Sequence, residues 1–124
     1  IKGADVFIGV SVGNVLKKEW VKTMNKKAII FALANPTPEI LPDEAIEGGS
    51  FIYASGRSDF SNQINNSLVF PGIFKGILKH NLEEITIEMK LLAAEAIAHS
   101  LTKKANTEYI IPDSLDRDVT LRIT

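Results

Sequence analysis

Three short apolar segments, each followed by polar sequence, stand out in the first half of the chain. Residues 5–10, 27–34 and 50–56 are nearly continuous runs of β-branched, aromatic and small apolar residues. Such runs, without regular polar alternation, are typical of parallel strands that are covered on both faces. The pattern therefore predicts three buried parallel strands.

Two helices are predicted between these strands. In residues 15–27, apolar side chains that include Trp20 and Val21 recur at helical spacing while lysines take the other side. This indicates an amphipathic helix of about three turns with Trp20 in its core-facing stripe. Residues 42–47 form a shorter candidate helix, because Pro42 suits the first helical position and two glycines follow its end.

The second half of the chain has a mainly helical pattern. Residues 65–79 and 86–101 carry apolar residues at helical spacing. Thr86 is suited to cap the second of these helices, and the sequence around Pro71 is expected to disturb the first. Towards the end of the chain, the alternation in residues 119–123 predicts a short strand.

The order strand, helix, strand, helix, strand, with short connections, predicts an α/β fold with a doubly wound parallel sheet. The chain enters its first strand almost at once after Ile1, although such a strand normally follows earlier elements. We therefore expect the chain to be the C-terminal part of a larger protein.

Composition narrows the class of protein. With 14 Lys and Arg against 15 Asp and Glu, and no basic block, the chain lacks the positive patch of a nucleic-acid binder. Its apolar runs are too short to span a bilayer and no export signal opens it, so we expect no membrane partner. The absence of cysteine excludes disulfides and a cysteine nucleophile, and favours the cytoplasm as the compartment.

The carboxyl ends of the predicted strands select the candidate site, because ligands of open parallel sheets bind there. The loops at these ends are residues 9–14, 35–39 and 55–66, which are rich in amides, hydroxyls and glycine but poor in acid, base or nucleophile pairs. Asn and Gln do not titrate, so they suit recognition of a carboxylate or carboxamide better than proton transfer. The sequence therefore predicts a binding site, with the amide of Asn35 at the mouth of the second strand.

Several of these residues also have a purely structural explanation. Arg57 and Asp59 are close enough in sequence to form a local ion pair that shapes the third loop, and we favour that role over a catalytic one. Asn before Pro is a good turn residue, and the glycines in residues 9–13 are typical of a strand-to-helix turn. His80 and His99 have no partner at metal-ligand spacing, so we predict no metal site there.

Five segments between Gly3 and about Asp118 carry a resemblance to a known family. They are GADVFIGVSVGN, IIFALANPTPEI, YASGRSDFSNQINNSLVFPGIFKG, MKLLAAEAIA and EYIIPDSLD. The combination of ANPTPE with NQINN and FPG about thirty residues later is much more specific than any single segment. In this order the segments resemble the C-terminal half of the cofactor-binding domain of the malic enzymes, specifically the shorter bacterial ones.

The resemblance implies the fold, the activity and the site residues. Residues 1–124 would be the C-terminal part of an NAD(P)-binding domain, with the second half of a Rossmann-like sheet followed by C-terminal helices. The implied reaction is oxidative decarboxylation of malate to pyruvate and carbon dioxide, with reduction of NAD or NADP and a Mg or Mn ion. The implied substrate-binding residues are Asn35 and Asn66, and the implied cofactor-binding residues are Gly9, Val10, Ser11, Asn35 and Asn65.

Several parts of the family's machinery have no match in this chain. The acid/base tyrosine and lysine, the three metal-binding carboxylates, the glycine-rich dinucleotide turn and the residue that separates NAD from NADP are expected upstream. We therefore assign no catalytic residue and no metal ligand here, and expect the chain alone to be inactive. The expected partner is a small molecule, malate or pyruvate, and the full-length protein is expected to form a homo-oligomer, as malic enzymes generally do.

Two other interpretations stay open. The chain could be a complete, non-catalytic Rossmann-like domain that binds a nucleotide or a partner protein, which the absence of acid/base groups supports. It could also belong to a different nicotinamide-dependent dehydrogenase with the same half-sheet. The order of Asn35 and the pair Asn65 and Asn66 argues against that second interpretation, by resemblance.

Overall fold

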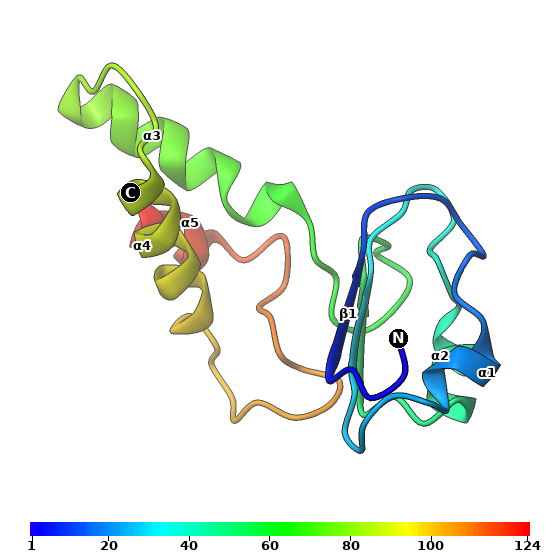
Figure 1. Ribbon diagram of the computed structural model, residues 1–124. Helices are drawn as coiled ribbons and strands as arrows, with labels where there is room; N and C mark the ends of the chain where they lie inside the picture. The colour runs from blue at the N-terminus through cyan, green and yellow to red at the C-terminus, as the bar shows by residue number, and fades with distance from the viewer. The chain divides into compact units, whose positions relative to one another are not determined.

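The computed structural model describes all 124 residues, which form two compact units (Figure 1). Unit 1 comprises residues 1–64 and 106–109, and unit 2 comprises residues 65–105 and 110–124. Each unit has its own elements and its own packing.

Unit 1 is built on a parallel sheet in which the strand order is β1-β2-β3. The strands pair in register, with Phe7 beside Ile30 and Ile30 beside Tyr53. They lie inside the three apolar runs of the sequence, so the prediction of three parallel strands in an α/β fold is confirmed. The strands are β1 (Val6–Gly9), β2 (Ile29–Ala32) and β3 (Ile52–Ser55).

Two helices, α1 (Lys18–Val21) and α2 (Pro42–Glu47), lie on the same side of the sheet (Figure 1). As predicted, Pro42 stands in the first turn of α2 and Gly48 follows its end, because the proline ring suits a position where no intrahelical amide bond is needed. The core of unit 1 forms on this side. Its buried residues are Leu16, Val21, Ile30, Ala32, Ile40, Ala45 and Tyr53.

The other side of β1 is open. Val6 and Ile8, which alternate with the core residue Phe7 along the strand, are 47% and 62% exposed. The prediction that the first strand is covered on both faces is therefore wrong for this chain. The central strand β2 differs, because Ile29 and Phe31, which pair with Val6 and Ile8, are partly buried.

The helix predicted over residues 15–27 is a single turn. The Gly3 N–H donates to the Thr23 carbonyl at 2.8 Å, and the Asn25 N–H donates to the Ala4 carbonyl at 3.0 Å. The segment after α1 therefore bonds to the beginning of the chain instead of extending the helix. The short helix buries Val21 but leaves Trp20 53% exposed, so the prediction that Trp20 is a core residue is wrong.

Unit 2 is helical. Its helix α3 begins at Phe70 with Pro71 in the first turn, so the predicted disturbance around Pro71 is a break between η1 and α3. The last helix, α5, packs against the other two, and a Cβ on Gly72 would come within 2.6 Å of the Ile123 Cβ. The elements are η1 (Asn66–Leu68), α3 (Phe70–His80), α4 (Ile87–Ala98) and α5 (Arg117–Ile123).

Side-chain caps begin the helices α4 and α5. The Thr86 hydroxyl accepts a hydrogen bond from the Met89 N–H at 3.2 Å, which confirms the predicted cap of α4. The strand predicted over residues 119–123 is wrong, because these residues lie in α5, where Asp116 accepts from the Asp118 N–H at 2.9 Å. None of the helices combines the length and apolar character needed to cross a membrane.

Candidate functional site

The carboxyl ends of the three strands of unit 1 start three loops at adjacent positions. Gly9 at the end of β1 lies beside Ala32 of β2, and Ala32 lies beside Ser55 of β3. The loops that follow begin at one edge of the sheet, which is where ligands bind in open parallel sheets. This edge is the candidate site.

The predicted site residues of unit 1 lie at this edge. Gly9 is buried, whereas Val10, Ser11 and Asn35 are exposed. Val10 is 79% exposed. The peptide bond between Asn35 and Pro36 is cis. The structure therefore brings Asn35 and residues 9–11 to the same edge, with their polar groups open to solvent.

A fully buried carboxylate holds the first two loops together. The backbone ladder between β1 and β2 ends where the Leu33 N–H donates to the Gly9 carbonyl at 2.9 Å. Beyond it, the Ser11 N–H donates to Glu39 Oε1 at 2.9 Å and the Ala34 N–H donates to Glu39 Oε2 at 3.0 Å. Glu39 is 0% exposed. We call Glu39 with these two amides the buried clamp.

Glycine at position 9 makes room for the buried clamp. A Cβ on Gly9 would come within 2.5 Å of Glu39 Oε1, closer than such atoms can approach. Gly13 makes a similar approach to the next loop, since a Cβ there would lie 2.7 Å from the Thr37 Cβ. The two glycines that the sequence suggested were only turn residues are therefore required by close packing of the first loop on the second.

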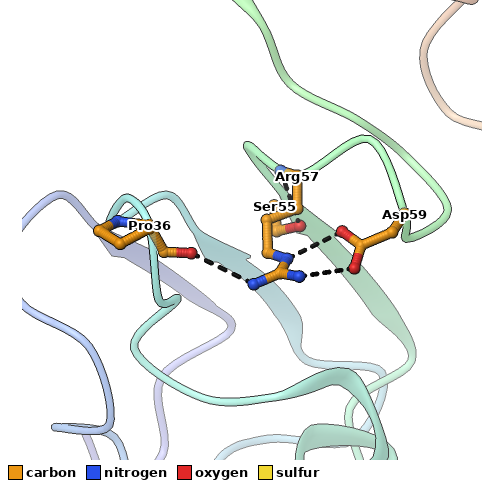
Figure 2. Close-up of polar contacts among 4 residues, drawn as sticks. All are labelled: Pro36, Ser55, Arg57 and Asp59. Atoms are coloured by element: carbon orange, nitrogen blue, oxygen red, sulfur yellow. Dashed lines mark hydrogen bonds and ion pairs between the residues drawn. The ribbon is translucent and has the colours of Figure 1, made fainter.

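An exposed guanidinium links the second loop to the third (Figure 2). Arg57 Nε and Nη2 donate to the two carboxylate oxygens of Asp59 at 2.8 and 2.6 Å, and Nη1 donates to the Pro36 carbonyl at 3.3 Å. The predicted ion pair between Arg57 and Asp59 is confirmed. We call Arg57 with Asp59 and the Pro36 carbonyl the surface clamp.

The surface clamp affects the ionisation of its members. The hydrogen bond from Arg57 lowers the pKa of Asp59, and the hydrogen bond to Asp59 raises the pKa of Arg57. Both side chains remain open to water, with exposed fractions of 41% and 53%. Arg57 also lies over the Phe60 ring, 5.1 Å from its centroid. This arrangement stabilises the shape of the third loop and gives no sign of an acid/base role.

Asn65 and Asn66 begin unit 2. The Asn65 side chain accepts a hydrogen bond from the Ser67 N–H at 3.0 Å and so caps η1, of which Asn66 is the first residue. Both residues are exposed. Ile64, the residue before them, ends unit 1 and donates its N–H to the Ser55 carbonyl at the end of β3. Their assignment as ligand-binding residues stays a prediction.

The comparisons with known proteins identify the family. A family model described as the malic enzyme, NAD-binding domain, matches residues 2–124. The chain belongs to the malic enzyme family. It is 51% identical over 120 residues to a bifunctional malic/malolactic enzyme of Bacillus subtilis (strain 168), and 52% identical over 124 residues to an NAD-dependent malic enzyme of Geobacillus stearothermophilus. These matches cover 96% and 99% of this chain.

Solved malic enzymes share the fold. The crystal structure of an NAD-dependent malic enzyme from Thermotoga maritima matches 98% of this chain with a TM-score of 0.92 and 54% identity. The chain spans 29% and 26% of the two relatives named above, and 32% of the crystallised protein. Proteins named as NAD-dependent and as NADP-dependent malic enzymes both match it. The Rossmann-like α/β fold expected of the chain is therefore confirmed.

Val10 and Asn35, at the carboxyl edge of unit 1, are the residues that could hold one end of a nicotinamide cofactor. The buried clamp brings the Ser11 and Ala34 amides to a single carboxylate, and the exposed Val10 and Asn35 are the neighbours of these two residues in sequence. An apolar ring that carries a carboxamide needs an apolar surface together with amide partners, and Val10 and Asn35 are side chains of these two kinds.

The metal ion of malic enzymes has no comparable fit here. No group of three or more His, Asp or Glu side chains lies close enough together to hold a metal ion. His80 and His99 are both exposed. No step of the reaction is therefore assigned to a metal held by this chain.

A cleft elsewhere in unit 1 is separate from this edge. It has a volume of about 440 Å³ and is lined by residues of α2, of β3 and of the loop after β3, among them Tyr53, Phe60 and Asn62. None of the predicted site residues lines it. The cleft therefore indicates a different place in unit 1 from the carboxyl edge, which the malic enzyme motif indicates.

Glu39 is the site residue that sequence reasoning did not single out. It closes the motif of residues 35–39 and stands directly before the apolar residues Ile40 and Leu41. An acidic residue next to an apolar pair, in a loop at the carboxyl edge of a sheet, was the available signal. It is weak, because such a residue is more often a solvated loop position.

Proposed function

We propose that this chain is the part of a malic enzyme that holds the nicotinamide end of NAD or NADP and the adjacent carboxylate of malate. The complete reaction would be oxidative decarboxylation of malate to pyruvate and carbon dioxide. The observation that carries the proposal is the exposed Asn35 at the carboxyl edge of a chain that belongs to this family; it follows Ala34, whose N–H shares the Glu39 carboxylate with the Ser11 turn.

Each predicted residue has a role in this proposal. Asn35 hydrogen-bonds the substrate and the nicotinamide end of the cofactor, and Asn66 hydrogen-bonds a malate carboxylate. Residues 9–11 and Asn65 line the cofactor. These contacts hold the reacting atoms at a fixed separation, which lowers the barrier without proton transfer by the asparagines. Residues 9–11, Asn35 and Asn65 would hold the cofactor, which when bound would supply the acceptor for the hydride of malate.

The reaction also needs groups that these residues do not supply. An acid/base pair and a Mg or Mn ion are expected from parts of the malic enzymes that this chain does not span. Nothing in the chain selects NAD over NADP, so the proposal covers both. We also propose a homo-oligomer and a cytoplasmic location for the complete protein, as expected for the family and for a chain without cysteine.

The proposal is tested by two alanine variants of the complete gene product, Asn35→Ala and Asn66→Ala. Loss of one hydrogen bond to a charged substrate group is worth roughly 1.5–3 kcal/mol, so we expect kcat/KM for malate to fall about tenfold to a hundredfold in each. Circular dichroism and the thermal midpoint should not change. Asn25→Ala is the matched control, because Asn25 bonds Asp5 before β1, at the opposite edge of the sheet.

The outcomes separate the interpretations. Unchanged kinetics in both asparagine variants would remove the substrate-site assignment. A wild-type protein that binds NAD(P)H but never turns over malate would instead favour the stand-alone binding domain.

A further inference from the structure

We propose that Glu39 is a positioning residue of the site: its carboxylate fixes the Ser11 turn and the Asn35 segment in the arrangement that the ligands require. The proposal rests on the proposed function for the identity of those ligands. It assigns a role to a residue that contacts neither cofactor nor substrate. Its evidence is the geometry of the buried clamp.

The burial of Glu39 is the first argument. A charged carboxylate that is fully removed from water is costly unless it is well hydrogen-bonded, and Glu39 has 0% exposure. Neither ion pair of the chain includes it, since these join Lys18 to Glu47 and Arg57 to Asp59. Its hydrogen bonds are instead to two backbone amides. The buried carboxylate therefore has these two amides, and no charged side chain, as its partners.

The position of the two amides is the second argument. Ser11 and Ala34 lie just past the last backbone bond of the β1–β2 ladder, which joins the Leu33 N–H to the Gly9 carbonyl. Backbone amides without a strand partner must be paired in another way. The Glu39 carboxylate accepts from both, so it continues the pairing of the two strands into the loops. Asn35 is the residue that directly follows Ala34.

The backbone of Glu39 is itself held in place. The Leu16 N–H donates to the Glu39 carbonyl at 3.0 Å, and the Asn14 N–H donates to the Pro38 carbonyl at 3.0 Å. Gly9 leaves no free space beside the carboxylate. The side chain therefore projects from a fixed point into a site of fixed shape, which is what a residue needs in order to set the position of two loops.

The chemistry of the clamp requires a carboxylate. Each oxygen of Glu39 accepts one N–H, so both positions must be acceptors. A Gln side chain has one acceptor oxygen and one NH₂ donor, and would set a donor against a donor at one of the two amides. Glu39→Gln keeps the size of the side chain and removes one half of the clamp, which makes it the sharpest variant.

The consequence for activity follows from the distances involved in catalysis. A displacement of about 1 Å at a reacting centre can cost roughly a hundredfold in rate. We expect kcat/KM for malate to fall about tenfold to a hundredfold in Glu39→Gln, with a weaker affinity for NAD(P)H. Glu44→Gln, which changes an exposed glutamate on α2 of the same unit, should leave both values unchanged.

The experiment combines kinetics with amide hydrogen exchange on the complete gene product. In the wild type, the Ser11 and Ala34 amides should exchange slowly, although Ser11 is exposed. In Glu39→Gln, at least one of them should lose its protection, while the Ile30 amide in β2 keeps its own. Reduced kcat/KM together with this local loss of protection supports the proposal, since a general loss of stability would affect Ile30 as well.

Three results would overturn the proposal: rapid exchange of both amides in the wild type, unchanged protection in Glu39→Gln, or lost protection with unchanged kcat/KM and NAD(P)H affinity.

If Glu39→Gln does not fold, Glu39→Asp replaces it, because the shorter side chain cannot reach both amides. If neither variant folds, the wild-type exchange rates decide. If the wild type does not turn over malate, only the proposed function is refuted. The amide exchange rates and the NAD(P)H affinity of Glu39→Gln then test the positioning role of Glu39.

Discussion

The buried clamp and the surface clamp attach the same central loop to its two neighbours by different means. On one side, the carboxylate of Glu39 accepts two backbone amides in a place closed to water. On the other side, the guanidinium of Arg57 donates to Asp59 and to the Pro36 carbonyl, and both charged side chains are about half exposed to solvent. Both contain a charged side chain, but the bonds of Glu39 are 2.9 and 3.0 Å long whereas the bond from Arg57 to the Pro36 carbonyl is 3.3 Å long.

The difference shows that burial, more than charge or distance, decides what such a contact contributes. Hydrogen bonds to a charged group are stronger in a low-dielectric interior, and an amide left unpaired there is costly. An exposed ion pair gains little, because water and salt screen it. We therefore expect the buried clamp to set the geometry of the site and the surface clamp to adjust only the third loop.

The largest effect should come from filling the space beside the buried clamp. In Gly9→Ala, the new methyl group would occupy the position of the Glu39 carboxylate. We expect the free energy of unfolding to fall by about 3 kcal/mol, the upper part of the range for overpacked cores, because both hydrogen bonds of Glu39 must break as well. Urea unfolding measures this change.

A matched control exists at the end of β3. A Cβ on Gly56 would meet nothing nearer than the Ile64 carbonyl at 3.8 Å, which is ordinary contact. Gly56→Ala should therefore be close to neutral. Equal destabilisation by the two alanines would mean that the approach of Gly9 to Glu39 has no special importance.

A smaller loss of stability is expected at Tyr53, which bonds to the backbone next to the buried clamp. The Tyr53 hydroxyl donates to the Ile40 carbonyl at 2.9 Å, next to Glu39 in the chain, and burial raises the pKa of Tyr53 to about 12. The hydroxyl therefore stays protonated at neutral pH and remains a donor. Tyr53→Phe removes this bond and should cost about 1 kcal/mol, measured by urea unfolding. No loss of stability would show that Ile40 finds another partner.

The smallest effect should come from the surface clamp. Arg57→Gln should leave the unfolding midpoint at neutral pH unchanged, because the ion pair is exposed. It should also raise the pKa of Asp59, which the Arg57 hydrogen bond lowers from an ordinary value of 3.8. Since a lowered carboxyl pKa stabilises the folded state above the ordinary value, this contribution disappears as the pH falls below 3.8. NMR titration of Asp59 measures the shift, and an unchanged pKa would contradict the clamp.

The sequence predicted the elements whose signals are local. The apolar runs gave β1, β2 and β3, Pro42 gave the start of α2, and Thr86 gave the cap of α4, because each signal acts within a few residues. The predictions of a three-turn helix over residues 15–27 and of a strand over residues 119–123 were wrong because they depended on distant partners. The chain after α1 bonds to residues 3 and 4, and Val119 is buried in unit 2 as part of α5, so an alternating pattern became a helix.

The features of the candidate site also differ in whether a local signal predicted them. The position of Asn35 and of residues 9–11 at the carboxyl edge followed from the strand pattern, and the Arg57 ion pair followed from its spacing. Glu39 did not follow, because its role depends on amides 5 and 28 residues away. Its burial becomes visible only when the two loops are placed together. The roles of Asn65 and Asn66 still rest on the family motif.

The most direct test of the account is a crystal structure of the complete gene product with a nicotinamide cofactor and malate or a malate analogue. We predict that the Asn35 side-chain amide lies within hydrogen-bond distance of the bound ligands and that the cofactor passes along Val10 and Ser11. A cofactor bound instead in the cleft beside Phe60, with Asn35 facing only solvent, would contradict the account.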